Sequence, residues 1–345
     1  MRIALDATYS LGEGLSGVGV YSREILNGLA ASGFAEEWDW FYRSQRYWRA
    51  RFRHVPPNVR VRLLSDHRGD RNASLFHGLN QRLPRKRFRR QVATFHDLFV
   101  LSGNYSTREF RDRFAEQARS AAAEADLIIA VSAFTASQVE QYLGVPPARI
   151  RVIHHGVVLR PIPSLPREKI ILCAGAIQRR KNQAALVRAF RAAPSDWTLV
   201  LAGSQGYEAA AVLREIAESP VSDRIRVTGY VSDDELANWY ARASLFAFPS
   251  FDEGFGMPVL EAMAAGVPVI AGNRAALPEI CGEAALLTDP DRDEDLAAAI
   301  TKLTADEALR AEFAARGKTQ AGKFHWADAV GRTIAVYQEL ADASA

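Results

Sequence analysis

The segment SLFAFPSFDEGFGMPVLEAMAAGVPVIAG (residues 244–272) contains the pattern that decides the fold. Its start, SLFAFPS (244–250), and its end, VPVIAG (267–272), are apolar runs that each predict a buried strand. The stretch between them predicts a glycine-containing loop and then a helix that begins near Met257, with Pro258 tolerated in its first turn. A strand, a helix and a second strand in this order indicate a parallel α/β unit.

The same succession of strands and helices continues along the whole chain. Continuous apolar runs, in place of alternating ones, suit strands that helices cover on both faces. We therefore predict an α/β protein with two doubly wound parallel-sheet domains. The other predicted strands are RIALDAT (2–8), WDWFYR (38–43), VRVRLL (59–64), SLFHGL (74–79), QVATFHDL (91–98), DLIIAVS (126–132), RIRVIHHG (149–156), KIILCAGA (169–176), WTLVLAGS (197–204) and RIRVTGYV (224–231).

The proline-rich stretch LRPIPSLP (159–166) marks the boundary between the domains, because prolines deny the chain a helix and leave an extended linker. A length of 345 residues also favours two domains. We assign residues 1–160 to the first domain and residues 161–324 to the second. Residues 325–345 predict a last amphipathic helix, which we expect to pack back toward the first domain.

The two halves of the chain also echo each other in sequence. ADLIIAVSAFTAS (125–137) resembles ASLFAFPSFDEG (243–254), and ARIRVIHHGV (148–157) resembles DRIRVTGYVS (223–232). These similarities predict two copies of one architecture.

Composition excludes several classes of protein. Hydrophobic residues make up 48% and charged residues 24% of the chain, which is ordinary for a soluble globular protein. Cys173 and Cys281 stand alone in apolar surroundings, so we expect reduced cysteines in a cytoplasmic protein and neither a disulfide scaffold nor a zinc site. Asp6 interrupts the first apolar run, which therefore predicts a strand and not a signal peptide. No uncharged apolar run approaches ~18 residues, so we expect no membrane span.

The net charge of +3 is spread unevenly. Residues 1–160 hold 24 Lys and Arg against 15 Asp and Glu, giving +9, whereas the remainder holds 19 against 25, giving −6. A basic first half predicts that this half meets an anionic partner.

Two carboxylates, Glu253 and Glu261, lie eight residues apart around the predicted start of the helix. Gly254 and Gly256 free the backbone to approach a ligand closely, and the helix start offers unpaired N–H groups to an anion. Glu253 would accept hydrogen bonds from hydroxyl groups, and Glu261 would reach vicinal diols such as those of a ribose. The alternative is a capping acid and a solvated helix acid, which explains the apolar flanks less well.

A pair of cations follows an earlier strand. In GAIQRRKN (175–182), Arg180 and Lys181 are expected at the start of a helix. Arg as a bidentate fork and Lys as a point charge suit a diphosphate. The alternative is a solvated basic helix start, which is the commoner case for an isolated RRK.

The motif Glu253-Gly-Phe-Gly-Met-Pro-Val-Leu-Glu261, with the AMAAGVPVIA that follows, resembles the paired-glutamate motif of glycosyltransferase family four. The motif is long and specific. The resemblance covers the whole chain, most strongly over 169–275 and less over 30–90. It implies the GT-B fold, in which two Rossmann-like domains face each other across a cleft. It further implies a retaining transfer of a hexose such as mannose from a nucleotide diphosphate sugar to a glycan or lipid-linked acceptor, in polysaccharide or cell-surface glycan synthesis.

The resemblance also assigns roles to residues within and outside this motif. His96 in TFHDL stands where the family has a histidine that faces the transferred sugar, and it completes a predicted catalytic set with Glu253, Arg180 and Lys181. The predicted donor-binding residues are Gly17 and Gly19 in a glycine loop, Gly203, Tyr230 and Val231 near the nucleotide base, and Phe255, Gly256, Met257, Pro258 and Glu261.

The sequence departs from the family pattern at two places. Ala176 stands where many members have an arginine after the glycine, so the phosphate contact must come from elsewhere, and Arg180 is the candidate. His154-His155-Gly156 replaces the usual Pro-Asn-Gly at the interdomain hinge.

The acidic run DPDRDEDL (289–296) has the spacing of metal ligands. We predict that it caps a helix instead, because Asp is a preferred capping residue and no bidentate Glu follows at calcium-loop spacing. We expect no metal and no cofactor besides the nucleotide sugar, since Arg180, Lys181 and the helix dipole can stabilise the leaving diphosphate.

The basic stretches YRSQRYWRARFRH (42–54) and RLPRKRFRR (82–90) leave the partner of the first half open. Arginines interleaved with aromatic residues suit an anionic membrane surface, which would place the protein in the cytoplasm with peripheral contact to the inner face of the membrane. A solvated face and a nucleic-acid-binding surface are the alternatives, although we expect no nucleic acid partner.

Three rival functions remain at this point. A nucleic-acid-binding protein would leave the paired glutamates unexplained. The intact charged residues of the two motifs disfavour a catalytically silent GT-B partner subunit. The family motif disfavours a sugar-nucleotide epimerase or a phosphorylase of similar fold.

Overall fold

The chain folds into two compact units. The computed structural model describes residues 2–12, 14–35, 37–65, 73–85, 87–157 and 162–342. The first unit comprises Met1–Ser102, Arg108–Gly156 and His325–Ala345, and the second comprises Gly103–Thr107 and Val157–Phe324. Within the predicted linker, residues 158–161 lie outside the described part of the chain.

The first unit is built on a parallel sheet. Within the described residues it has seven strands in the order β3-β2-β1-β4-β5-β6-β7. The strands are β1 (Arg2–Asp6), β2 (Glu37–Tyr42), β3 (Val59–Leu63), β4 (Leu75–Gly78), β5 (Gln91–Phe95), β6 (Leu127–Ala130) and β7 (Ile150–Val152). The helices are α1 (Gly17–Ala31), α2 (Ser44–Ala50), α3 (Phe99–Ser102), α4 (Arg108–Glu124), α5 (Ala133–Leu143) and α13 (Trp326–Asp342). The direction of winding reverses between β1 and β4, the position where open α/β sheets place their ligands.

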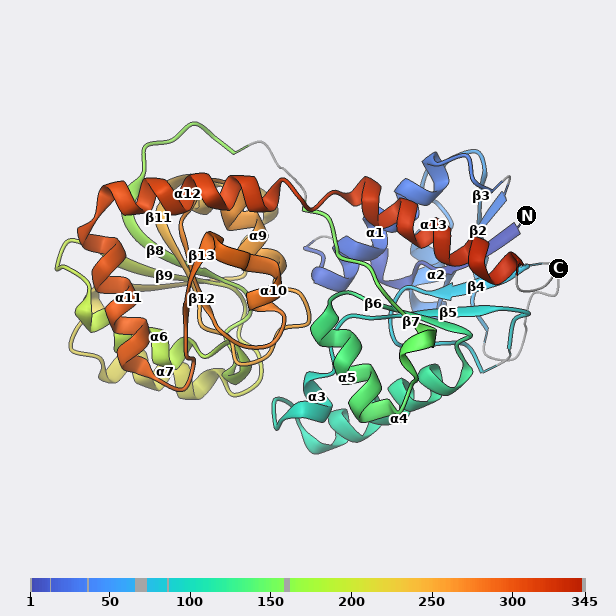
Figure 1. Ribbon diagram of the computed structural model, residues 1–345, viewed down its shortest axis with the longest axis horizontal. Helices are drawn as coiled ribbons and strands as arrows, with labels where there is room; N and C mark the ends of the chain where they lie inside the picture. The colour runs from blue at the N-terminus through green and yellow to red at the C-terminus, as the bar shows by residue number, and fades with distance from the viewer. Residues whose placement is uncertain are drawn as a thin grey trace. The chain divides into compact units, whose positions relative to one another are not determined.

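The second unit repeats this plan. Over residues 162–342 its six strands are parallel and lie in the order β10-β9-β8-β11-β12-β13. They are β8 (Glu168–Ala174), β9 (Thr198–Ala202), β10 (Ile225–Gly229), β11 (Ala243–Phe248), β12 (Val269–Gly272) and β13 (Ala285–Thr288). The helices are α6 (Gln183–Ala189), α7 (Ala209–Glu218), α8 (Asp233–Arg242), α9 (Met257–Ala264), α10 (Leu277–Cys281), α11 (Asp293–Ala305) and α12 (Glu307–Ala321). In Figure 1, α12 runs beside α9 and α11 runs beside α6.

The prediction of two doubly wound parallel sheets is confirmed, and every predicted strand is present. The central strands β4, β5 and β6 are buried along their whole length, as continuous apolar runs require. The sequence analysis missed β13, an edge strand in which two of the four residues are only partly buried.

The pairing of the sequence echoes is wrong, although the repeated architecture is correct. By position in its sheet, β11 corresponds to β4 and not to β6, and β10 corresponds to β3 and not to β7. The similar segments have similar burial, but they do not occupy equivalent positions in the two sheets. β6 and β11 are both buried apolar strands, whereas β7 and β10 are both partly exposed strands at a sheet edge.

The last helix belongs to the first unit. α13 lies beside α1 (Figure 1). Its Tyr337 is almost fully buried, and the hydroxyl lies 2.6 Å from Nδ1 of His77 on β4. The chain therefore leaves the first unit at Gly156, builds the second, and returns at His325 to complete the first.

Candidate active site

Two loops at the carboxyl edge of the second sheet hold the predicted charged residues. One loop follows β8 and leads to a 3₁₀ turn, Arg179–Lys181. The other follows β11 and leads to α9. Because β8 and β11 are neighbours at the reversal of strand order, these loops meet, and the Phe251 amide donates to the Arg180 carbonyl at 2.9 Å.

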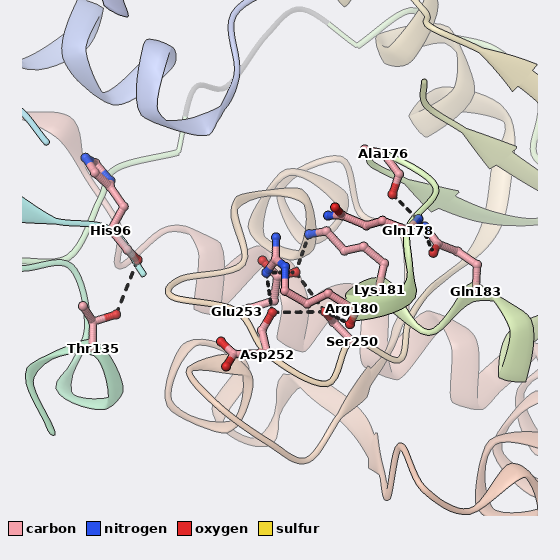
Figure 2. A network of polar contacts seen from close by, with 10 residues as sticks. All are labelled: His96, Thr135, Ala176, Gln178, Arg180, Lys181, Gln183, Ser250, Asp252 and Glu253. Atoms are coloured by element: carbon pink, nitrogen blue, oxygen red, sulfur yellow. Dashed lines mark hydrogen bonds and ion pairs between the residues drawn. The ribbon is translucent and has the colours of Figure 1, made fainter. Parts of the chain in front are cut away.

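The predicted position of the cations at a helix start needs correction. Arg180 and Lys181 lie in the 3₁₀ turn, and Asn182 with φ of 56° separates them from α6. The left-handed backbone at Asn182 redirects the chain, so both side chains point back toward the β11 loop instead of lying along the helix (Figure 2).

Glu253 forms ion pairs with both Arg180 and Lys181. Its Oε1 atom lies 3.1 Å from a terminal nitrogen of Arg180, accepts a hydrogen bond from Lys181 Nζ, and accepts another from Ser250 Oγ at 2.9 Å. Lys181 Nζ also lies 4.5 Å from the centre of the Phe248 ring. Figure 2 shows this cluster, in which Arg180, Lys181 and Glu253 are each less than 10% exposed. The residues that sequence reasoning proposed for catalysis in this half therefore form one buried ion cluster.

The two cations set the ionisation of Glu253. Burial alone would raise the pKa of Glu253, but Arg180 and Lys181 outweigh it and hold that pKa below the usual value, so the carboxylate is ionised at neutral pH. Burial lowers the pKa of Lys181, and Glu253 opposes this effect. Both cations lie at the carboxyl edge of the sheet, beside the reversal of strand order where such sheets bind ligands.

The loop before the cations is held by a residue that the sequence analysis did not single out. Gln183 is buried, its Nε2 donates to the Ala176 carbonyl at 3.0 Å, and its Oε1 accepts from the Gln178 amide at 3.2 Å (Figure 2). The backbone of Gly203 lies so close to this loop that a Cβ atom on it would be 2.0 Å from the Gly175 carbonyl oxygen. Gly203 is thus required for packing against this loop, and its predicted donor contact stays a prediction.

The helix after the second loop begins at Met257, as predicted. Gly256 is its N-cap residue with φ of 97°, a left-handed conformation that favours glycine. Glu261 lies about one turn into the helix, where it accepts a hydrogen bond from the Tyr240 hydroxyl at 3.0 Å. Tyr240 on α8 is buried, so it fixes the direction of the Glu261 carboxylate.

The other residues predicted to bind the donor surround these loops. Tyr230 follows β10 and is 62% exposed, and Val231 is partly exposed. Met257 and Pro258 in the first turn of α9 are partly exposed too. Phe255 is buried, with its ring edge-to-face on Phe324 at 6.0 Å between centroids, so it supports the loop from inside.

In the first unit, His96 lies just beyond the carboxyl end of β5. Its Nε2 donates to the Leu79 carbonyl at 2.9 Å, which leaves Nδ1 as the lone-pair nitrogen of a neutral ring. Burial lowers the pKa of His96 to about 4, despite the opposing bond to Leu79. The ring is therefore neutral at physiological pH and suits hydrogen bonding, not acid catalysis.

The predicted glycine loop is wrong in one respect. Gly17 and Gly19 lie inside the first turn of α1 and not in the loop before it, because Ser16 caps the helix with its Oγ accepting from the Gly19 amide at 3.4 Å. Gly17 is exposed, whereas Gly19 is buried. Their donor contact stays a prediction.

The acidic run does not cap α11 as predicted. Arg292 is the N-cap residue and makes no side-chain capping bond, whereas Asp289 and Asp291 pair with Arg274. The described residues contain no group of three or more His, Cys, Asp or Glu that could hold a metal ion.

Comparison with known proteins identifies the family. The profile described as "Glycosyltransferase Family 4" matches residues 33–160, and "Glycosyl transferases group 1" matches residues 159–320. O-antigen chain mannosyltransferase B of Escherichia coli is 30% identical over 284 residues, which cover 77% of this chain and 74% of the relative. Serotype-specific mannosyltransferase WbdA of Escherichia coli is 31% identical over 281 residues, but the chain spans only 34% of that relative's length.

The fold comparison agrees. Sucrose-phosphate synthase from Thermosynechococcus elongatus superposes with a TM-score of 0.81 at 23% identity, covering 99% of this chain and 100% of that one. In the part of the chain that the structure describes, no helix has the length and hydropathy needed to span a membrane. The predictions of the family, the GT-B fold and an enzyme are confirmed. The chain belongs to glycosyltransferase family four, and it is a nucleotide-sugar-dependent glycosyltransferase.

Proposed function

We propose that this enzyme transfers mannose or a related hexose from a nucleoside diphosphate sugar to a saccharide acceptor of a cell-surface glycan, with retention of the anomeric configuration. The observation that carries the proposal is the buried cluster of Arg180, Lys181 and Glu253 at the carboxyl edge of the second sheet. Both Escherichia coli relatives are named as mannosyltransferases, one of them for the O-antigen chain, which supports the sugar and the class of product.

The cluster supplies the charges that such a transfer needs. Arg180 and Lys181 bind the donor diphosphate, where they stabilise the negative charge that grows on it as the bond to the sugar breaks. The incoming diphosphate competes with Glu253 for the two cations. Glu253 is then released toward the hydroxyl groups of the transferred sugar, and Glu261 accepts hydrogen bonds from the ribose. This chemistry uses residues of the chain alone, and we propose that it requires no metal.

Donor binding is the first test. We expect one of GDP-, UDP-, ADP- or TDP-sugars to raise the melting temperature, because a ligand at 100 times its Kd stabilises the native state by about 2.7 kcal/mol. Lys181→Ala should lose most of this shift. Lys169→Ala is the matched control, since Lys169 is an exposed lysine of the same unit that pairs with Asp196. Failure of all four nucleotide sugars to stabilise the wild type, or an equal shift in Lys181→Ala, would argue against the proposal.

An anionic membrane surface is a second proposed partner, and one surface of the first unit supports it. Trp48 is 61% exposed and Phe52 is 83% exposed, and Arg51 lies 5.8 Å from the centre of each ring. Arg49 and Arg53 flank them in the chain. Exposed aromatic rings among arginines match the interface of an anionic bilayer. A lipid-linked acceptor would lie at such a surface.

The membrane proposal predicts binding to vesicles. The wild type should co-sediment with phosphatidylglycerol-containing vesicles. The double variant Trp48→Ser, Phe52→Ser should bind about 10-fold or more weakly, because it loses two exposed rings that would become buried in the bilayer. Val227→Ser removes an exposed apolar residue of the acidic second unit and should bind normally. If the double variant also binds normally, these rings do not contact lipid.

A further inference from the structure

Three aromatic rings from distant parts of the chain form a row in the first unit. The centroid of the His155 ring lies 5.4 Å from that of His96 and 5.7 Å from that of Trp326. The interplanar angles are 32° and 28°, so each pair of rings is closer to parallel than to perpendicular. His96 follows β5, His155 precedes the exit of the chain from the first unit, and Trp326 is the first residue of α13. The row therefore joins His96 to the last helix.

The middle ring of the row belongs to a residue that the proposed chemistry does not use. His155 lies in His154-His155-Gly156, the segment that departs from the family pattern. It is 3% exposed, and burial, together with His96 and His154, lowers its pKa well below the usual value. The ring is therefore neutral at physiological pH and packs as an aromatic group, not as a cation.

Tyr21 on α1 encloses the row from a second direction. Its ring is 1% exposed and lies edge-on to His96, with 4.7 Å between centroids, and it lies 4.8 Å from His155 and 6.2 Å from Trp326. The Tyr21 hydroxyl is itself held, 2.9 Å from Oγ1 of Thr94. A side chain enclosed by packed neighbours has few rotamers open to it. The His96 imidazole is therefore held by neighbouring rings as well as by its own hydrogen bond.

Gly156 allows the last helix to reach the row. Its backbone lies against the start of α13, so that a Cβ atom on Gly156 would be 2.2 Å from the Trp326 amide nitrogen. One residue further on, the Val157 amide donates to the Phe324 carbonyl at 3.1 Å, so these two stretches of chain run side by side. A larger side chain at position 156 would push Trp326 away from His155.

We propose that His155 and Trp326 are positioning residues for the transfer, and that their rings hold the His96 imidazole in the orientation that faces the donor sugar. A histidine free to turn would offer its lone-pair nitrogen in several directions, and fewer molecules would be ready to react. The last helix of the chain thereby contributes to the site through its first residue. This inference rests on the proposed function, because His96 has this role only if the chain transfers a sugar.

Imidazole NMR of the full-length protein labelled with ¹⁵N-histidine tests the orientation of His96. At pH 7.5 the wild type should show one neutral tautomer of His96, protonated at Nε2, because Nε2 donates to a carbonyl. The signals are identified by their loss in His96→Gln. In His155→Asn and in Gly156→Ala, the shifts of the two ring nitrogens should move toward each other, as they do when both tautomers are populated. His155→Phe restores a ring and should keep the wild-type shifts.

Donor hydrolysis measures the consequence for the reaction. The nucleoside diphosphate is released from whichever GDP-, UDP-, ADP- or TDP-sugar stabilises the wild type. Its kcat should fall about 3- to 10-fold in His155→Asn and Gly156→Ala, as expected for lost ring contacts. The Kd of the free diphosphate should not change, because the cations lie in the second unit. Gly331→Ala is the matched control, since Gly331 lies on α13 where a Cβ atom would meet nothing within 4 Å.

Wild-type nitrogen shifts of His96 in both His155→Asn and Gly156→Ala would overturn the inference, and so would a wild-type kcat in both. If one of the two variants does not fold, the other decides. Failure of the wild type to release diphosphate from any of the four nucleotide sugars would count against the proposed function instead. The nitrogen shifts would then still decide whether His155 and Gly156 set the orientation of His96.

Discussion

Glu253→Gln is expected to lower kcat about 10- to 100-fold and, at the same time, to tighten binding of the free nucleoside diphosphate about 3- to 10-fold. The fall in kcat follows because contacts to the sugar strengthen as positive charge grows at its anomeric carbon. The gain in affinity follows from the structure. Glu253 occupies both Arg180 and Lys181, so its neutralisation leaves two buried cations that a diphosphate can satisfy.

Isothermal titration with the diphosphate and steady-state kinetics with saturating acceptor measure the two effects. Lys181→Ala is the comparison of opposite sign, and it should weaken diphosphate binding about 10- to 100-fold. Glu261→Gln should mainly raise the donor KM, since a ribose contact is similar in the ground and transition states. If Glu253→Gln weakened diphosphate binding as Lys181→Ala does, Glu253 would organise the cations and not compete for them.

Acidification from pH 7.5 to 5.5 is expected to destabilise the first unit by about 1.4 kcal/mol for each of its buried histidines. Burial lowers the pKa of His77 to about 3, that of His96 to about 4 and that of His155 well below its usual value. The unfolded chain, with histidine pKa values near 6.5, therefore binds more protons than the folded one in this range. The stability that these three groups contribute is present above pH 6.5 and falls as the pH drops toward 4. The raised pKa of Asp6 works in the opposite direction.

His77→Gln tests the histidine effect. His77 is hydrogen-bonded to Tyr337 at 2.6 Å and to Thr94 at 2.8 Å, so the variant should be less stable than the wild type at pH 7.5. At pH 5.5 the difference in unfolding free energy between the wild type and the variant should narrow by about 1.4 kcal/mol, because glutamine takes up no proton on unfolding. Urea titrations at both pH values measure this difference, and His54→Gln is the control because His54 is exposed. An equal difference in unfolding free energy at both pH values would show that His77 does not cause the loss of stability in acid.

The sequence predicted the fold and the residues of the charged cluster because both depend on local patterns. Continuous apolar runs identify buried parallel strands, and the motif from Glu253 to Glu261 is long enough to be specific. The pairing of Glu253 with the cations was not predictable. It depends on the left-handed Asn182 and on the neighbouring positions of β8 and β11, which are separated by about 70 residues of chain.

Supporting residues were missed for a related reason. Gln183, Tyr240 and Ser250 have no special spacing. Gln183 and Ser250 hold nearby loop residues, and Tyr240 bonds to Glu261 on another helix, so each role depends on the folded path of the backbone.

The return of the chain to the first unit at His325 sets the order in which a ribosome can complete the two halves. The second unit is whole once Phe324 has emerged, whereas the first still lacks α13 and the partner of His77, 260 residues downstream of it. The first unit, whose synthesis begins first, is therefore the last to be completed. Copies that end early retain Arg180, Lys181 and Glu253 but leave a flank of α1 uncovered, so quality control should recognise them by the unfinished amino-terminal half.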